Sequence, residues 1–226
     1  MRNTTVDVNG EDVPGYIAFP ASGSGRPVVV IQEWWGLVPH IVDVCDRFAQ
    51  AGFVALAVDH YRGAETTEPN EAQKLMIGLN IEQVGHDLAA AADDLLRREG
   101  VEGDTVSVTG FCMGGGLALL APTLSESICC TAAWYPAMPW PQYAPDWSRY
   151  GGKAAIVHKA ESDEDWAGAK IAAYAAAIVA SGGTVEVDDY PGSVHAFFND
   201  ARPEVYQPAT AALAWDRTLR LFRGCA

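Results

Sequence analysis

The sequence predicts an α/β fold in which a mainly parallel central sheet is covered by helices on both faces. Short runs rich in valine or alanine recur along the chain, and amphipathic stretches separate them. This alternation is typical of parallel strands joined by helices. With 226 residues, 49% of them hydrophobic, the chain can bury one substantial core, so we expect residues 1–226 to form a single domain.

The N-terminal part predicts a hairpin followed by a buried strand. Residues 4–8 and 14–19 read as short strands around Asn9-Gly10, a dipeptide that favours a tight turn. Residues 27–32 form a continuous apolar run, which is typical of a parallel strand buried on both faces. Glu33 follows directly, so we expect it at the carboxyl end of that strand.

Helices and strands alternate through the middle of the chain. Apolar residues at helical spacing predict an amphipathic helix within 41–52, and the next strand is expected at 53–58. The same spacing predicts a long helix over 81–98. A strand at 105–109 and a helix reaching Leu124 follow it.

The C-terminal part predicts three more strands and two helices. Strands at 130–135 and 154–158 are separated by a Pro- and Trp-rich excursion, 136–147, whose prolines exclude regular structure. This excursion could cover a pocket. The remaining elements are a helix at 166–179, a strand at 184–189 and a closing helix at 208–222.

Charge and composition exclude several classes of partner. The net charge of −14 and the pI near 4.6 argue against binding to nucleic acid or to an anionic membrane. No apolar run approaches the roughly 18 residues of a membrane span, and residues 1–9 lack the pattern of a signal peptide. We therefore expect a cytoplasmic monomer or small homo-oligomer.

The cysteine pattern does not indicate disulfides or a metal site. The five cysteines are odd in number and form no CxxC pair. Cys45 falls on the apolar face of a predicted helix, while Cys129 and Cys130 begin an apolar run. We interpret these three as small hydrophobic residues.

The strongest motif is Gly110-Phe111-Cys112-Met113-Gly114-Gly115, between a predicted strand and a predicted helix. It has the pattern of a nucleophile elbow with cysteine in the serine position, where glycines leave room for a sharp turn. A thiol at a helix N-terminus is also activated toward the thiolate. The alternatives are a cysteine that only packs under the helix, or a turn that binds phosphate, although the GxGxxG and GK[ST] patterns are absent.

An elbow nucleophile needs an acid and then a histidine later in the chain. His195 follows the last predicted strand and a Pro-Gly turn, where it would be exposed at the sheet edge. The acid should follow the strand at 154–158, and we choose Asp163, although Asp165 could also serve or could cap the next helix. Glu33 is either a further member of the site or a structural glutamate with a buried partner.

Together these segments resemble the dienelactone hydrolase family over nearly the whole chain. The matching segments are Gln32-Glu33-Trp34-Trp35-Gly36-Leu37, Asp46-Arg47-Phe48-Ala49, Ala51-Gly52-Phe53, Asp59-His60-Tyr61-Arg62, the cysteine elbow and Tyr190 to Phe198. The resemblance implies an α/β-hydrolase fold and cleavage of a lactone or ester, with no metal or organic cofactor.

The resemblance also implies roles for individual residues. Cys112, His195 and Asp163 would form the catalytic triad, and Glu33 would hold the resting thiol. The backbone N–H groups of Met113 and Trp34 would bind the oxyanion. The acyl-enzyme formed on the cysteine would then be hydrolysed.

Two departures from the family pattern bear on the acid and on the substrate. Ala160 stands where the family favours glycine before the acid, and Asn199 stands where the family places an arginine for the substrate carboxylate. Candidate substrate-binding residues are Arg62, Arg202, Trp34, Trp35, Tyr135 and Trp140. The alternative functions are a thioesterase or general carboxylesterase of the same fold, and a non-catalytic protein that binds a small ligand.

Overall fold

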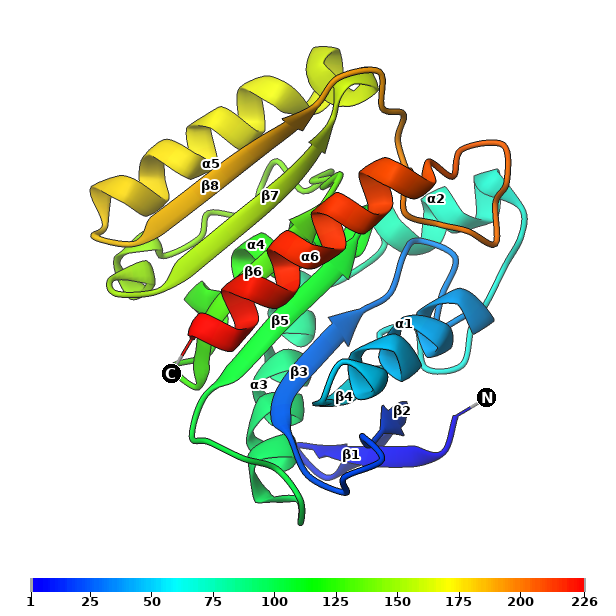
Figure 1. Cartoon of the computed structure of the whole chain (residues 1–226), viewed down its shortest axis with the longest axis vertical. Helices are drawn as coiled ribbons and strands as arrows, with labels where there is room; N and C mark the ends of the chain where they lie inside the picture. The colour runs from blue at the N-terminus through cyan, green and yellow to red at the C-terminus, as the bar shows by residue number, and fades with distance from the viewer. Residues whose placement is uncertain (1, 226) are drawn as a thin grey trace.

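A computed structural model describes residues 2–225, and its strands form one eight-stranded sheet in the order β1-β2-β4-β3-β5-β6-β7-β8 (Figure 1). The strands are β1 (Thr4–Val8), β2 (Glu11–Ala18), β3 (Arg26–Ile31), β4 (Phe53–Val58), β5 (Val106–Phe111), β6 (Ile128–Trp134), β7 (Ala154–Ala160) and β8 (Thr184–Tyr190). The α-helices are α1 (Pro39–Gln50), α2 (Pro69–Ile77), α3 (Ile81–Arg97), α4 (Met113–Leu124), α5 (Ala169–Ala180) and α6 (Pro208–Gly224).

The sheet is mainly parallel, as the sequence predicts. β2 pairs antiparallel with β1 and β4, and the remaining neighbours are parallel. The chain leaves β3 toward β4 on one side, whereas β5 lies on the other side of β3. Ligands of open α/β sheets bind at such a reversal of strand order, beyond the carboxyl ends of the strands. The segments that follow β3 and β5 therefore meet at this edge.

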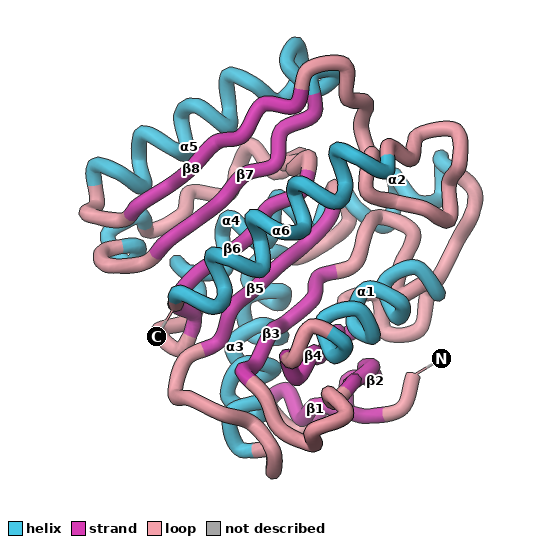
Figure 2. The backbone as a smooth tube through the Cα atoms, in the orientation of Figure 1, coloured by secondary structure: helices cyan, strands magenta, loops and turns pink. Residues whose placement is uncertain are grey.

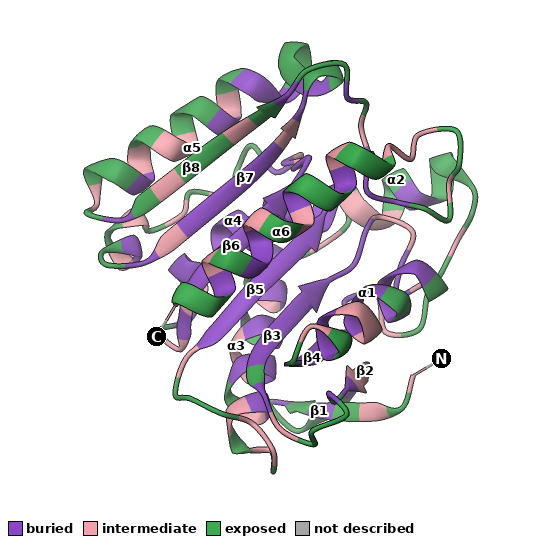
Figure 3. Ribbon diagram, in the orientation of Figure 1, coloured by how far each residue is buried: buried purple, intermediate pink, exposed green. Residues whose placement is uncertain are grey.

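Helices cover both faces of the sheet (Figure 2). Buried side chains of α1 and α6 share one core cluster, and those of α3 and α4 share the cluster on the opposite face. β4 and β5 are buried along their whole length, and all of β3 except Arg26 is buried (Figure 3). None of the helices formed by residues 2–225 has the length and continuous apolar character of a membrane span.

Two elements differ from the sequence-based expectation. α2 was not predicted, because Ala72 is its only buried residue and the helix shows no apolar stripe. The helix expected from residue 166 begins as an α-helix only at Ala169. A 3-10 turn, Glu161–Asp163, and a π-helical turn, Glu164–Gly168, come first. π-turns are often found at functional sites, and this one begins directly after the predicted acid.

Candidate active site

Cys112 occupies the sharp turn between β5 and α4. Its backbone has φ 55° and ψ −115°, a strained conformation for a residue with a side chain. A Cβ atom on Gly110 would lie 2.0 Å from the carbonyl oxygen of Gly114, and one on Gly114 would lie 2.5 Å from that of Ile31. Only glycine fits at these two positions. The predicted nucleophile elbow is therefore present in the backbone.

The thiol of Cys112 lies at the N-terminal end of α4. Cys112 is the N-cap residue, and Met113 is the first residue of the helix. The first N–H groups of a helix have no acceptor within it and carry its partial positive charge. The N–H of Met113 thus belongs to a set of donors suited to a developing oxyanion beside the sulfur.

The structure brings His195 and Asp163 into direct contact. The Nδ1 atom of His195 lies 2.7 Å from Oδ2 of Asp163, whose side chain is buried. The thiol of Cys112 also acts on this imidazole ring and raises its pKa. Asp165 is exposed to solvent, so its position does not match that of a buried orienting acid.

The two loops that carry His195 and Asp163 are joined by several hydrogen bonds. The Oγ atom of Ser162 accepts from the N–H of His195 at 2.8 Å and donates to Oδ1 of Asp163 at 3.1 Å. The Oγ atom of Ser193 accepts from the N–H of Glu161 at 3.0 Å. These bonds fix the imidazole relative to the carboxylate before any substrate binds.

Burial lowers the pKa of His195, but hydrogen bonds and charge from Asp163 and Cys112 outweigh it and raise the pKa to about 10. Because the pKa is raised in the folded state, protonation of His195 stabilises the fold. This stabilisation is fully present below pH 6.5, the ordinary pKa of histidine, and is lost as the pH rises through about 10. Carbamidomethylation of Cys112 removes one partner and is expected to lower the pKa, as NMR titration of the imidazole would measure. An unchanged titration after alkylation would contradict the Cys112–His195 contact.

Two aromatic rings pack against the imidazole of His195. Tyr135, fully buried and at φ 37°, lies 5.1 Å from His195 between ring centroids, and Trp166 lies 5.5 Å from it. Tyr135 was predicted to bind substrate, yet its ring packs beneath the histidine. Trp166 is 54% exposed and was not predicted to belong to the site, because its sequence position indicated only the start of a helix.

Glu33 lies directly after β3, as predicted, and is buried. Its Oε2 atom accepts a hydrogen bond from Nδ2 of Asn199 at 3.0 Å. Burial raises the pKa of Glu33, although the charges of His195 and Arg202 and the bond from Asn199 act in the opposite direction. The structure thus pairs Glu33 with Asn199 rather than with the thiol of Cys112.

A cavity of about 840 Å³ opens on the side of Glu33 and Asn199. Trp35 and Arg202, two of the predicted substrate contacts, line this cavity. His40 also lines it and was passed over because it falls on a helix. Burial lowers the pKa of His40 to about 4, so this side chain is neutral near pH 7.

Arg62 and Trp140, which were predicted to contact substrate, do not line this cavity. The guanidinium of Arg62 pairs with both carboxylate oxygens of Asp87 and with Glu11, so its charge is already satisfied. The Nε1 atom of Trp140 donates to the carbonyl oxygen of Met76 at 3.2 Å. Trp140 thereby attaches the predicted excursion to α2.

Comparisons with known proteins show the family of the chain. A model of the dienelactone hydrolase family matches residues 13–225. "Protein usf" of Aquifex pyrophilus is 36% identical over 95% of this chain and 94% of its own length. The "Putative carboxymethylenebutenolidase" of Aquifex aeolicus is 32% identical over the same shares.

A solved structure with the printed name "Putative Dienelactone Hydrolase", from Klebsiella pneumoniae, is similar in both sequence and fold. It is 27% identical, has a TM-score of 0.85, and the match covers 98% of this chain and 97% of that one. Its fold agrees with the α/β-hydrolase architecture predicted above. The chain belongs to the dienelactone hydrolase family of hydrolases.

Proposed function

We propose that the chain hydrolyses a lactone or ester by covalent catalysis, with Cys112 as nucleophile, His195 as acid and base, and Asp163 as the orienting acid. The observation that carries this proposal is the imidazole of His195, whose Nδ1 atom lies 2.7 Å from Oδ2 of Asp163 and whose pKa is raised by Asp163 and Cys112. That is the arrangement by which unrelated hydrolases activate a nucleophile.

The proposed reaction has two steps. In the first, the thiolate of Cys112 attacks the carbonyl carbon, the N–H groups of Met113 and Trp34 bind the oxyanion, and the C–O bond breaks as His195 protonates the leaving oxygen. In the second, neutral His195 removes a proton from water, and the water attacks the thioester. Loss of the thiolate releases the acid and leaves the proton on His195.

The substrate is proposed to be a small molecule that enters through the cavity beside Glu33. Trp35 offers a flat apolar surface there, and Arg202 lines the same cavity with a cationic group. With Asn199 bound to Glu33, a negatively charged part of the substrate would meet Arg202, whose Nε atom pairs with the exposed Glu204 and whose two Nη groups can still donate. The Arg62 pair with Asp87 makes that arginine unsuitable for this role.

Trapping of the acyl-enzyme tests the proposed function. The reduced chain is mixed with an aryl ester, a lactone or a thioester, quenched in acid and digested, and each cysteine peptide is weighed by mass spectrometry. We expect the acyl group on the peptide that contains Cys112, and none on buried Cys45. Relative rates across the panel distinguish a lactonase from a thioesterase or a general carboxylesterase.

Two results would count against the proposal. Hydrolysis without an adduct on Cys112, under conditions that trap other acyl-enzymes, would exclude the covalent route. Tight binding of these compounds without turnover would favour a protein that only binds a small ligand.

A further inference from the structure

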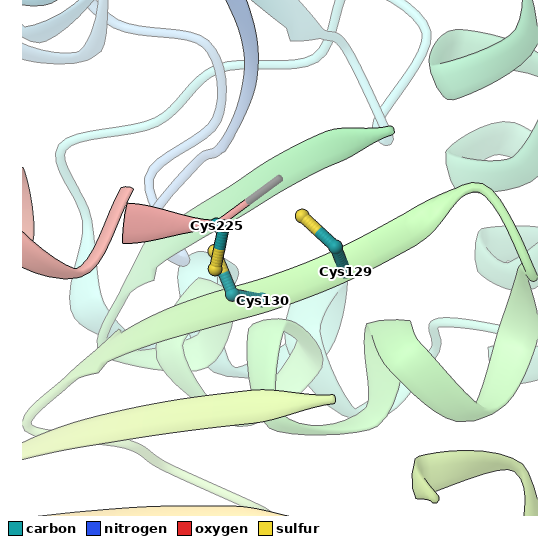
Figure 4. A group of neighbouring side chains, drawn as sticks. All are labelled: Cys129, Cys130 and Cys225. Atoms are coloured by element: carbon teal, nitrogen blue, oxygen red, sulfur yellow. The ribbon is translucent and has the colours of Figure 1, made fainter. Parts of the chain in front are cut away.

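Two adjacent cysteines and a third that is distant in the sequence meet at the end of the sheet opposite Cys112. Cys129 and Cys130 follow Ile128, the first residue of β6, and Cys225 follows the last residue of α6. The three Sγ atoms all lie within 4.8 Å of one another (Figure 4). Cys130 is buried, whereas Cys129 and Cys225 are partly exposed, so solutes can reach the group.

An irregularity in the sheet places the two adjacent cysteines together. Consecutive side chains of a regular strand point to opposite faces. Here Val106 of β5 pairs with Ile128, but the next residue, Ser107, pairs with Cys130, which leaves Cys129 as an extra residue in β6. Such a β-bulge re-aims side chains and is common beside functional sites.

Hydrogen bonds hold both thiols of the bulge in place. The thiol of Cys129 donates to the carbonyl oxygen of Val106 at 3.6 Å. The Sγ atom of Cys130 lies 3.3 Å from Oγ of Ser107. The bulge and these contacts bring two potential ligand atoms to one side of β6 without any further element of structure.

The third thiol is positioned by the end of α6. The N–H of Cys225 donates to the carbonyl oxygen of Leu221 at 3.1 Å. Arg26 donates from Nη1 to the carbonyl oxygens of Arg223 and Cys225. This arginine precedes the apolar part of β3, so the end of α6 is tied to the sheet next to the bulge.

The surroundings favour a cation bound by sulfur. A cavity of about 320 Å³ reaches the group and is lined by Cys129 and Cys225, with Glu102 and Asp104 contributing carboxylates. For a metal–sulfur bond of about 2.3 Å, ligand sulfurs lie roughly 3.8 to 4.0 Å apart, which is compatible with the observed grouping.

We propose that Cys129, Cys130 and Cys225 form a binding site for a thiophilic d10 cation, for which Zn²⁺ is the probe. Each thiol loses its proton as its sulfur binds the metal, so binding releases protons and strengthens as the pH rises. Soft thiolate ligands select Zn²⁺ and Cu⁺ over Mg²⁺ or Ca²⁺. The site is independent of the proposed hydrolase, since β5 separates Ser107 from Cys112 by five residues, roughly 16 Å along the strand.

Competition with a chromophoric chelator tests the site. The full chain, reduced and stripped of metal, is titrated with Zn²⁺ as wild type, Cys225→Ser and Cys112→Ala. We expect one equivalent to bind to the wild type and to Cys112→Ala. Loss of a group that only hydrogen-bonds to a metal ligand already lowers metal affinity by about 10- to 100-fold. Cys225→Ser removes a ligand itself, so we expect it to bind Zn²⁺ at least about 100-fold more weakly than the wild type.

Two further measurements complete the test. Co²⁺ bound to the wild type should give a thiolate-to-metal charge-transfer band that is absent from Cys225→Ser. Cys225→Ser should hydrolyse esters at the wild-type rate, because Cys225 lies far from Cys112, and this result shows that the variant is folded.

Three outcomes would overturn the proposal. The first is no Zn²⁺ binding by the reduced wild type. The second is binding that survives in Cys225→Ser. The third is binding that disappears in Cys112→Ala, which would place the metal at the catalytic thiol.

Discussion

Replacing Cys112 with alanine is expected to lower kcat for an activated ester by about 10⁴-fold or more, because binding and oxyanion contacts alone supply only a small part of the acceleration. The substitution removes the atom that would form the acyl-enzyme while leaving the backbone of the elbow in place. Steady-state hydrolysis of an aryl ester and of a lactone measures the effect. Wild-type kcat in the variant would rule out Cys112 as the nucleophile.

Cys45→Ala is the matched control for this loss. Cys45 is a fully buried cysteine of α1, and burial raises the pKa of its thiol. We expect Cys45→Ala to keep wild-type kcat, and Cys45 to resist iodoacetamide while Cys112 is labelled. Inactivation by iodoacetamide that persists in Cys112→Ser, if that variant is active, would show that labelling elsewhere is responsible.

Replacing Asp163 with asparagine is expected to lower kcat by about 10³- to 10⁴-fold, because an amide cannot stabilise the imidazolium and favours the wrong tautomer of His195. The same change removes one of the groups that raise the pKa of His195 to about 10. Two readouts are therefore coupled: kcat falls, and the NMR titration of His195 moves to lower pH. Native NMR spectra of the variant would show that it is folded. A lower kcat together with a His195 titration at lower pH would then not be explained by misfolding.

Asp165→Asn is the control for the choice of acid. Asp165 is exposed on the π-helical turn two residues further along the chain. We expect its substitution to leave both kcat and the titration of His195 close to those of the wild type. The reverse result, with Asp165→Asn inactive and Asp163→Asn active, would show that the acid has been misassigned.

The elbow could be predicted from sequence because its requirements are local. Nearby backbone atoms leave no room for a Cβ atom at Gly110 or Gly114, so the spacing of these glycines indicates the sharp turn directly. The order of Cys112, Asp163 and His195 also follows from strand order, since each residue comes after the carboxyl end of a parallel strand. The structure places Nδ1 of His195 2.7 Å from Oδ2 of Asp163.

Other features of the site depend on packing between distant segments, and no local pattern reports them. Arg62 follows a strand, as a substrate contact might, but its partner Asp87 lies 25 residues away on α3. Trp166 approaches His195 because of a π-turn that periodicity does not detect. The grouping of Cys129 with Cys130 depends on a one-residue shift of register between β5 and β6, which a strand-like sequence does not indicate.

The shape of the backbone at the elbow does not depend on the reactive atom that residue 112 carries. The tight backbone contacts belong to Gly110 and Gly114, and the strained φ of 55° belongs to the main chain, so none of them depends on which atom residue 112 carries beyond its Cβ. The same backbone can therefore carry either a cysteine thiol or a serine hydroxyl at position 112. Evolution could alternate between thiol and alcohol nucleophiles here through single codon changes, and the scaffold would not need to be rebuilt.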